Sequence, residues 1–62
     1  MKMTLRALRV NKRKTQHEAA KDLNISIDTL KNYESGRTYP DVPMIRRIEA
    51  YYGVNYDSIE FF

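Results

Sequence analysis

The residues most able to do chemistry in this chain are cations gathered in its amino-terminal segment. Residues 1–14 contain six lysines and arginines and no acid, so this segment carries +6; the whole chain carries +3, and residues 15–62 therefore sum to −3. The six cations are Lys2, Arg6, Arg9, Lys12, Arg13 and Lys14. A basic end on a mildly acidic domain is typical of a protein that binds a polyanion. The alternative is a solvated helix face whose last cations offset the helix macrodipole.

Residue types that support catalysis or metal binding are scarce. His17 is the only histidine and cysteine is absent, which leaves no cysteine nucleophile, no thiolate site and no histidine-based metal site. The acidic residues are scattered, and no glycine-rich phosphate loop is present. We therefore expect that the chain is not an enzyme and has no metal, cofactor or small-molecule ligand.

Two short helices joined by a tight turn form the centre of the chain, over residues 15–36. Thr15 followed by Glu18 is the capping-box pattern that begins a helix at the next residue. Asn24 ends this helix, because asparagine tolerates the left-handed backbone with which a chain leaves a helix. Ser26 is an N-cap for the second helix. With so short a turn the two helices must cross steeply, as in a helix-turn-helix.

Three further short helices are expected around this pair, which makes an all-α domain of five short helices over residues 1–62. The first runs from a Thr4 cap to about Arg13, the fourth from an Asp41 cap to Gly53, and the last lies around Tyr56 to Glu60 after an Asn55 cap. The expected inward residues are Leu5, Leu8, Ile45, Ile48, Tyr52 and Ile59, with Val10 as a further candidate. Phe61 and Phe62 form either a lid on the first helix or an exposed patch for pairing.

A characteristic order of residues runs through the central helices. It comprises Gln16, Ala20, Asn24-Ile25-Ser26, Leu30, Tyr33-Glu34 and Gly36-Arg37. This order resembles the helix-turn-helix of the phage repressor and Cro family, the XRE type. LRALRVNK before it and PDVPMIRRIEAYYGVNYDSI after it are similar to the family's first, fourth and fifth helices. The chain departs from the family pattern at Asn24, Ala19 and Lys14, where glycine, leucine and an apolar residue are usual. The resemblance implies a lambda-repressor-like DNA-binding domain.

The resemblance also implies which residues face the bases. They are Gln16, Ile27, Asp28, Lys31 and Asn32. Asn32 can form a bidentate contact with adenine, and Asp28 can accept a hydrogen bond only from an amino group such as that of cytosine. Lys31 meets either a phosphate or guanine, and Gln16 either a phosphate or a base edge. Ile27 either touches a thymine methyl group or belongs to the core.

Phosphate contacts are implied at a second set of positions. They are Arg9, Lys14, Thr15, Arg37 and Tyr39. Arg9 matches a family arginine that pairs with the glutamate closing the recognition helix, here Glu34, and this pair would orient the guanidinium toward DNA. The dipole at the start of the second helix, with Thr15, is itself an anion site. Tyr39 either donates its hydroxyl to a phosphate or covers the edge of the core.

The number of base contacts bears on the assembly. Three or four contacts at roughly 1–3 kcal/mol each lift a single module little above nonspecific binding. We therefore expect a homodimer on double-stranded DNA, with half-sites about 34 Å apart.

Length and hydropathy limit the remaining possibilities. A chain of 62 residues is one domain with a small core and a stability on the order of 3–5 kcal/mol. No apolar run approaches the ~20 residues that cross a bilayer and the start lacks the features of a signal peptide, so we expect a cytoplasmic protein without a membrane partner. The resemblance suggests a small phage, prophage or mobile-element repressor. The alternative is a protein-interaction module of the same fold, an antitoxin or a regulator's partner, because Ile27 and Asp28 make the recognition face less basic.

Overall fold

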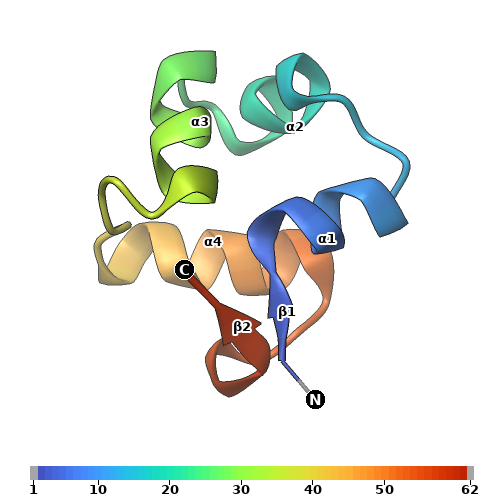
Figure 1. Ribbon diagram of the computed structural model, residues 1–62, viewed down its shortest axis with the longest axis vertical. Helices are drawn as coiled ribbons and strands as arrows, with labels where there is room; N and C mark the ends of the chain where they lie inside the picture. The colour runs from blue at the N-terminus through green and yellow to red at the C-terminus, as the bar shows by residue number, and fades with distance from the viewer. Residues whose placement is uncertain (1, 62) are drawn as a thin grey trace.

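The computed structural model describes residues 2–61, which form four α-helices, one 3₁₀ turn and two very short strands (Figure 1). In chain order these are β1 Met3–Thr4, α1 Leu5–Asn11, α2 Gln16–Leu23, α3 Ile27–Ser35, α4 Val42–Tyr52, the 3₁₀ turn Tyr56–Ser58 and β2 Ile59–Glu60. Helices α2 and α3 lie together on one side of α4, and the paired strands lie at the opposite end of the molecule (Figure 1). The all-α class is confirmed, with four α-helices in place of the five predicted.

The central helix-turn-helix forms at the predicted residues. The Thr15 hydroxyl accepts the N–H of Glu18 at 3.1 Å, and the Glu18 carboxylate accepts the N–H of Thr15 at 2.9 Å, so the capping box is complete. Asn24 ends α2 in the left-handed conformation, with φ 59° and ψ 44°. Ser26 then caps α3 by accepting the N–H of Thr29 at 3.1 Å. The turn between α2 and α3 is therefore specified by side chains within a few residues of it.

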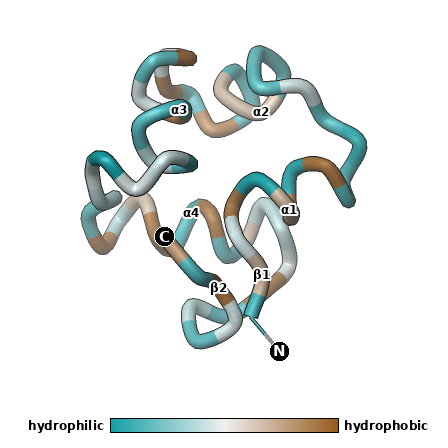
Figure 2. Tube along the Cα trace, in the orientation of Figure 1, coloured by the Kyte–Doolittle hydropathy of each residue, from teal (hydrophilic) through white to brown (hydrophobic). Residues whose placement is uncertain are grey.

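The core lies where α2 and α3 meet α1 and α4. It consists of Leu5, Leu8, Ala19, Ala20, Leu23, Leu30, Met44, Ile48, Ile59 and Phe61. Figure 2 shows apolar and polar residues alternating along the helices, as expected for helices with a single buried face. The small side chains of Ala19 and Ala20, 0% and 3% exposed, leave room for α3 to approach α2 closely.

Helix α1 is capped as predicted but is shorter than predicted. Thr4 accepts the N–H of Ala7 at 3.1 Å. The helix ends at Asn11 and not at about Arg13, because Arg13 has φ 60° and leaves the helical conformation. The candidate inward position of Val10 is wrong, since this side chain is 57% exposed. Two helical steps of about 100° carry Val10 far around the helix from the buried Leu8.

Helix α4 begins and ends at the predicted residues. A carboxylate oxygen of Asp41 accepts a backbone N–H three residues on at 3.0 Å. Gly53 ends the helix with φ 67°, a conformation that glycine adopts without strain. Ile48 is 1% exposed, and Ile45 and Tyr52 are partly buried against the core.

The final short helix predicted around Tyr56 to Glu60 is confirmed only in part, as a 3₁₀ helix over Tyr56–Ser58. A single 3₁₀ turn precedes strand β2, which pairs in parallel with β1 so that Ile59 lies opposite Met3. Asn55 makes no side-chain cap bond; the Glu49 carboxylate instead accepts the N–H of Tyr56 at 2.7 Å. The β-branched Ile59 still anchors the segment as predicted, at 4% exposed, but it does so in an extended conformation.

Of the two roles predicted for the terminal phenylalanines, Phe61 has that of a lid. It is 7% exposed and belongs to the core cluster that includes Leu5 and Leu8 of α1. Its ring centroid lies 5.2 Å from that of Tyr39 and 5.8 Å from that of Tyr56. An exposed pairing patch therefore does not include Phe61, and Phe62 lies outside the described residues.

The capping box gives a first test of the fold. We expect Thr15→Ala to lower the free energy of unfolding by about 1 kcal/mol, because the third N–H of α2 loses its acceptor, and to lower the melting temperature by about 4–8 °C. Thr38→Ala is the matched control, since Thr38 is exposed in the loop after α3. Thermal unfolding followed by circular dichroism measures both; equal melting temperatures for the two variants would contradict the role of Thr15.

Candidate nucleic-acid interface

The side of α3 that faces away from the core is polar. Asp28, Lys31 and Ser35 are exposed and Asn32 is partly exposed, whereas Leu30 is 1% exposed. Spacings of three and four residues place these polar side chains along one side of the helix. We refer to Asp28, Lys31, Asn32 and Ser35 as the outer face of α3. Three of the five predicted base-contacting residues therefore share one surface.

Ile27, another of the five, lies at the edge of this surface. Its side chain is partly buried and packs against the core cluster. Of the two roles predicted for Ile27, the core role therefore applies to the buried part of its side chain. The exposed part lies at the start of α3.

Gln16, the fifth, belongs to a hydrogen-bond network centred on Glu34. The Glu34 carboxylate accepts hydrogen bonds from Arg9 Nε at 2.8 Å, from Arg9 Nη2 at 3.3 Å and from Gln16 Nε2 at 3.2 Å. The side chains of Arg9 and Glu34 are 11% and 5% exposed. The predicted ion pair is therefore confirmed, and Gln16 joins it. Because the three residues come from α1, α2 and α3, the network fixes α3 relative to the two preceding helices.

Arg9 is also bound to the loop before α2. Its Nη1 donates to the carbonyl oxygen of Lys14 at 3.0 Å. Since all three guanidinium nitrogens bond within the protein, the structure places Arg9 in a positioning role. The phosphate contact predicted for Arg9 stays a prediction.

Tyr52 lies beside this network. Its hydroxyl oxygen is buried and has no hydrogen-bond partner within residues 2–61. Burial raises the pKa of Tyr52 to about 12, and the nearby Glu34 carboxylate adds to this. The phenol therefore stays neutral at any pH at which the domain would function.

Lys14 points along the flank of α2 toward α4. Its Nζ lies 3.5 Å from an Asp22 carboxylate oxygen, which also accepts the Tyr51 hydroxyl at 2.6 Å. The Lys12 ammonium lies 4.8 Å from the centroid of the Tyr51 ring. The hydrogen bond from Tyr51 lowers the pKa of Asp22, while burial and Asp22 raise the pKa of Tyr51. These contacts hold the loop between α1 and α2 against α4, so Lys14 has a structural partner beside its predicted phosphate contact.

The remaining predicted phosphate contacts are Thr15, Arg37 and Tyr39. The Thr15 hydroxyl is used by the capping box, whose hydrogen bonds also lower the pKa of Glu18. Arg37 is exposed, and within residues 2–61 its side chain forms no ion pair. Tyr39 is 52% exposed and its ring packs on Phe61, which is the core-covering alternative for the ring. Arg37 is thus exposed and outside any ion pair within the described residues, unlike Arg9 and Lys14.

A family profile described as helix-turn-helix matches residues 5–59. The match covers all four helices and the turn between α2 and α3. The chain belongs to the XRE-type helix-turn-helix family. Neither a curated protein nor a solved structure matches the chain.

Membership of the XRE-type family establishes the general function. The protein is a DNA-binding transcription regulator with double-stranded DNA as its partner. The family is a regulatory family and not a family of enzymes. Within residues 2–61 no helix is long and apolar enough to span a bilayer, and no group of three or more histidine, aspartate or glutamate residues could hold a metal ion.

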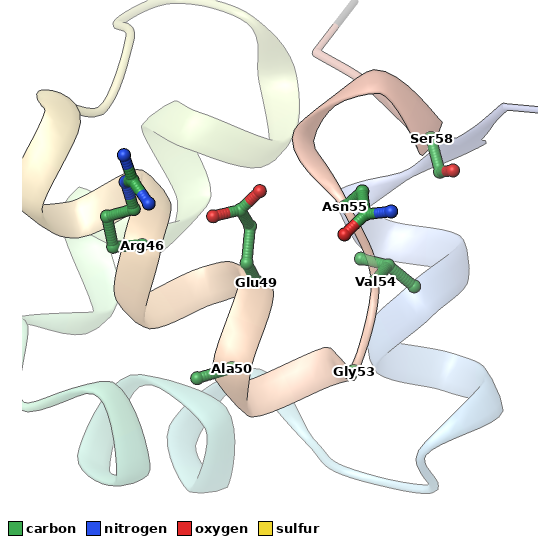
Figure 3. Close-up of a pocket in the computed structure, with 7 residues that line it drawn as sticks. All are labelled: Arg46, Glu49, Ala50, Gly53, Val54, Asn55 and Ser58. Atoms are coloured by element: carbon green, nitrogen blue, oxygen red, sulfur yellow. The ribbon is translucent and has the colours of Figure 1, made fainter.

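Of the concavities in the surface of this XRE-type domain, two differ in their relation to the predicted site. The larger, about 810 Å³, lies between the second half of α4 and the 3₁₀ turn, where Arg46 and Glu49 face Asn55 and Ser58 across open space (Figure 3). No predicted site residue lines it. A smaller concavity of about 400 Å³ lies between α1 and the outer face of α3, and Arg6 lines it together with Lys31.

Arg6 lines this concavity but is not among the residues predicted to contact DNA. The signal was present, because Arg6 precedes Arg9 by three residues and so shares its side of α1.

Proposed function

We propose that this regulator recognises a specific sequence in double-stranded DNA by placing α3 in the major groove. The observation that carries the proposal is the outer face of α3, which is polar and solvent-facing on a helix fixed by the Glu34 network. A recognition helix must present such a surface, and it must be rigid relative to the residues that contact the backbone.

Base contacts are assigned from the chemistry of the exposed groups. Asn32 forms bidentate hydrogen bonds with an adenine, and Asp28 accepts from a cytosine amino group. Gln16 uses one N–H for Glu34, which leaves its second N–H and its carbonyl oxygen for a base edge or a phosphate. The exposed part of Ile27 contacts a thymine methyl group. Asp28 adds selectivity and reduces affinity, since it repels the phosphates.

Backbone contacts come from residues on both sides of α3. Arg37 and Tyr39 contact the phosphates beyond its carboxyl end. Thr15 and Lys14 contact them at the start of α2, where the free N–H groups of the helix attract anions. Arg9 supports these contacts chiefly by holding Glu34. These contacts set the register on DNA without reading sequence.

The protein acts as a homodimer on an inverted repeat. Its longest Cα extent is 27 Å, shorter than the ~34 Å between major grooves one helical turn apart on the same side of DNA. Two copies therefore fit side by side with one α3 in each groove. By resemblance to the phage repressor and Cro family, we place the protein in the cytoplasm as a repressor of a phage, prophage or mobile element.

Selection of bound sequences from a random duplex pool tests this proposal. We expect an inverted repeat whose half-sites are centred about one helical turn apart. Enrichment of a single asymmetric half-site would contradict the dimer, and no enrichment at all would contradict specific recognition.

Two substitutions separate reading of the sequence from binding of the backbone. Asn32→Ala is expected to relax the preference at one base position per half-site, at about 1–3 kcal/mol, because a bidentate pair is lost. Arg37→Ala should instead weaken binding to all sequences alike. Competition binding with a panel of single-base operator variants measures both effects. The reverse pattern would show that α3 is rotated relative to our assignment.

A protein partner is the second candidate, favoured by one observation. Asp28 is exposed and acidic at the start of α3, and Ile27 next to it is apolar and partly exposed. Such a face also suits an antitoxin or a partner of another regulator. Absence of binding to duplex at low salt would favour this function, since nonspecific binding to DNA is strongest there.

A further inference from the structure

The concavity between α1 and α3 joins residues from three helices. Its lining consists of Arg6, Arg9, Gln16, Lys31, Glu34 and Ser35, around a volume of about 400 Å³. Arg6 and Arg9 come from α1, Gln16 from α2 and the other three from α3. The concavity therefore opens at the point where the outer face of α3 meets the basic side of α1.

The acidic group that lines this concavity, the Glu34 carboxylate, already has partners within the protein. It accepts three hydrogen bonds from Arg9 and Gln16, and the positive charge of Arg9 compensates its negative charge. The lining carries +3 from Arg6, Arg9 and Lys31 and −1 from Glu34, a sum of +2. An anion entering the concavity would meet a net positive field.

Two cations at the rim have no partner of their own. Arg6 and Lys31 are exposed, and within residues 2–61 neither forms an ion pair or a side-chain hydrogen bond. Arg6 stands one turn before Arg9 on α1 and Lys31 one turn before Glu34 on α3, and both line the concavity, one from each helix. Ser35 contributes a hydroxyl that bonds the carbonyl oxygen of Asn32 at 3.2 Å.

We propose that Arg6 and Lys31 together hold one phosphodiester group of the DNA backbone above the Arg9–Glu34 ion pair. The proposal rests on the DNA-binding mode proposed above. A phosphodiester carries one negative charge and accepts several hydrogen bonds, which suits a guanidinium on one side and an ammonium on the other. Arg6 thereby becomes a DNA-contacting residue, and of the two roles left open for Lys31, guanine or phosphate, the second is assigned.

The shared phosphate predicts a specific pattern of salt dependence. Each neutralised phosphate contributes about −0.9 to the slope of log K against log salt concentration. Arg6→Ala and Lys31→Ala should each weaken binding to every sequence alike. The double variant should reduce the slope by only about 1 per bound copy, because both residues serve one phosphate.

Fluorescence anisotropy with the full chain and a labelled duplex, at several salt concentrations, measures these slopes, and competition by unlabelled single-base variants of the duplex measures the base preference. Arg46→Ala is the matched control, since Arg46 is an exposed helical arginine on α4 outside this interface. Circular dichroism verifies that each variant folds. An Arg6→Ala affinity equal to that of Arg46→Ala, or a double-variant slope equal to that of the wild type, would overturn the proposal while wild-type binding upheld the proposed function. A Lys31→Ala variant that loses its preference at one base position would also overturn the proposal. So would a double variant whose slope of log K against log salt concentration falls by about 2 per bound copy.

A second arm separates the DNA backbone from a free anion. Inorganic phosphate, added at constant ionic strength with chloride as its replacement, should not displace the duplex at millimolar concentration. Displacement by phosphate alone would assign the concavity to a free anion and overturn the proposal. Failure of the wild type to bind any duplex would overturn both this inference and the proposed function.

Discussion

Glu34→Ala is expected to unfold a large fraction of the protein at 25 °C. The substitution leaves the Arg9 guanidinium, 11% exposed, without its acidic partner and removes the acceptor of Gln16. Removing one partner of a buried ion pair costs about 3 kcal/mol or more, which is comparable to the whole stability of a domain of this size, on the order of 3–5 kcal/mol. The melting temperature should fall by more than about 10 °C. Urea unfolding followed by circular dichroism measures the loss.

Two further variants show whether the loss of stability comes from the charge of Arg9 when it has no acidic partner. Glu60→Ala makes the same change at an exposed glutamate of β2 and should alter stability by less than about 0.5 kcal/mol. The double variant Arg9→Met, Glu34→Leu removes both charges and should recover part of the lost stability. If Glu34→Ala unfolds at the same urea concentration as Glu60→Ala, the Glu34 network does not hold the three helices together.

The second large effect is expected from salt. Each copy neutralises about three phosphates in the proposed complex, through the Arg6–Lys31 pair, through Arg37 and at the start of α2, or about six in the dimer. Raising the salt concentration from about 50 to about 200 mM should therefore weaken DNA binding by about 10³-fold, because the displaced counterions must be bound again. Equilibrium titration of a duplex that contains the selected operator measures this change.

Circular dichroism is the control for this effect. Its spectrum should be the same at both salt concentrations, because the salt is expected to change DNA binding and not the fold. A change in affinity of less than about tenfold would mean that the protein makes few backbone contacts. The protein-interaction alternative would then be the better description of the α3 surface.

Local capping explains why most of the fold could be predicted from the sequence. Thr4, Thr15, Ser26 and Asp41 each cap a helix by accepting an N–H three residues on. Asn24 ends α2 by adopting the left-handed backbone conformation itself. Such signals involve atoms close in the chain, so they can be recognised without knowing where the helices pack.

The error at the carboxyl-terminal segment has the opposite cause. Ile59 is extended because its backbone pairs with that of Met3, 56 residues earlier in the chain. Asn55, the predicted N-cap, makes no side-chain cap bond, and the Glu49 carboxylate accepts the N–H of Tyr56. A strand of two residues has no sequence pattern of its own, so only its partner decides its conformation.

The sequence by itself determined the helix-turn-helix and its outer face, because helical spacing alone places Asp28, Lys31 and Asn32 on the same side. Tertiary structure decided how the other candidates are used. It bonded Gln16 to Glu34 and placed Lys14 beside Asp22. Long, flexible polar side chains find their partners only once separate helices have packed, whereas caps and helix faces follow from the local geometry of the backbone.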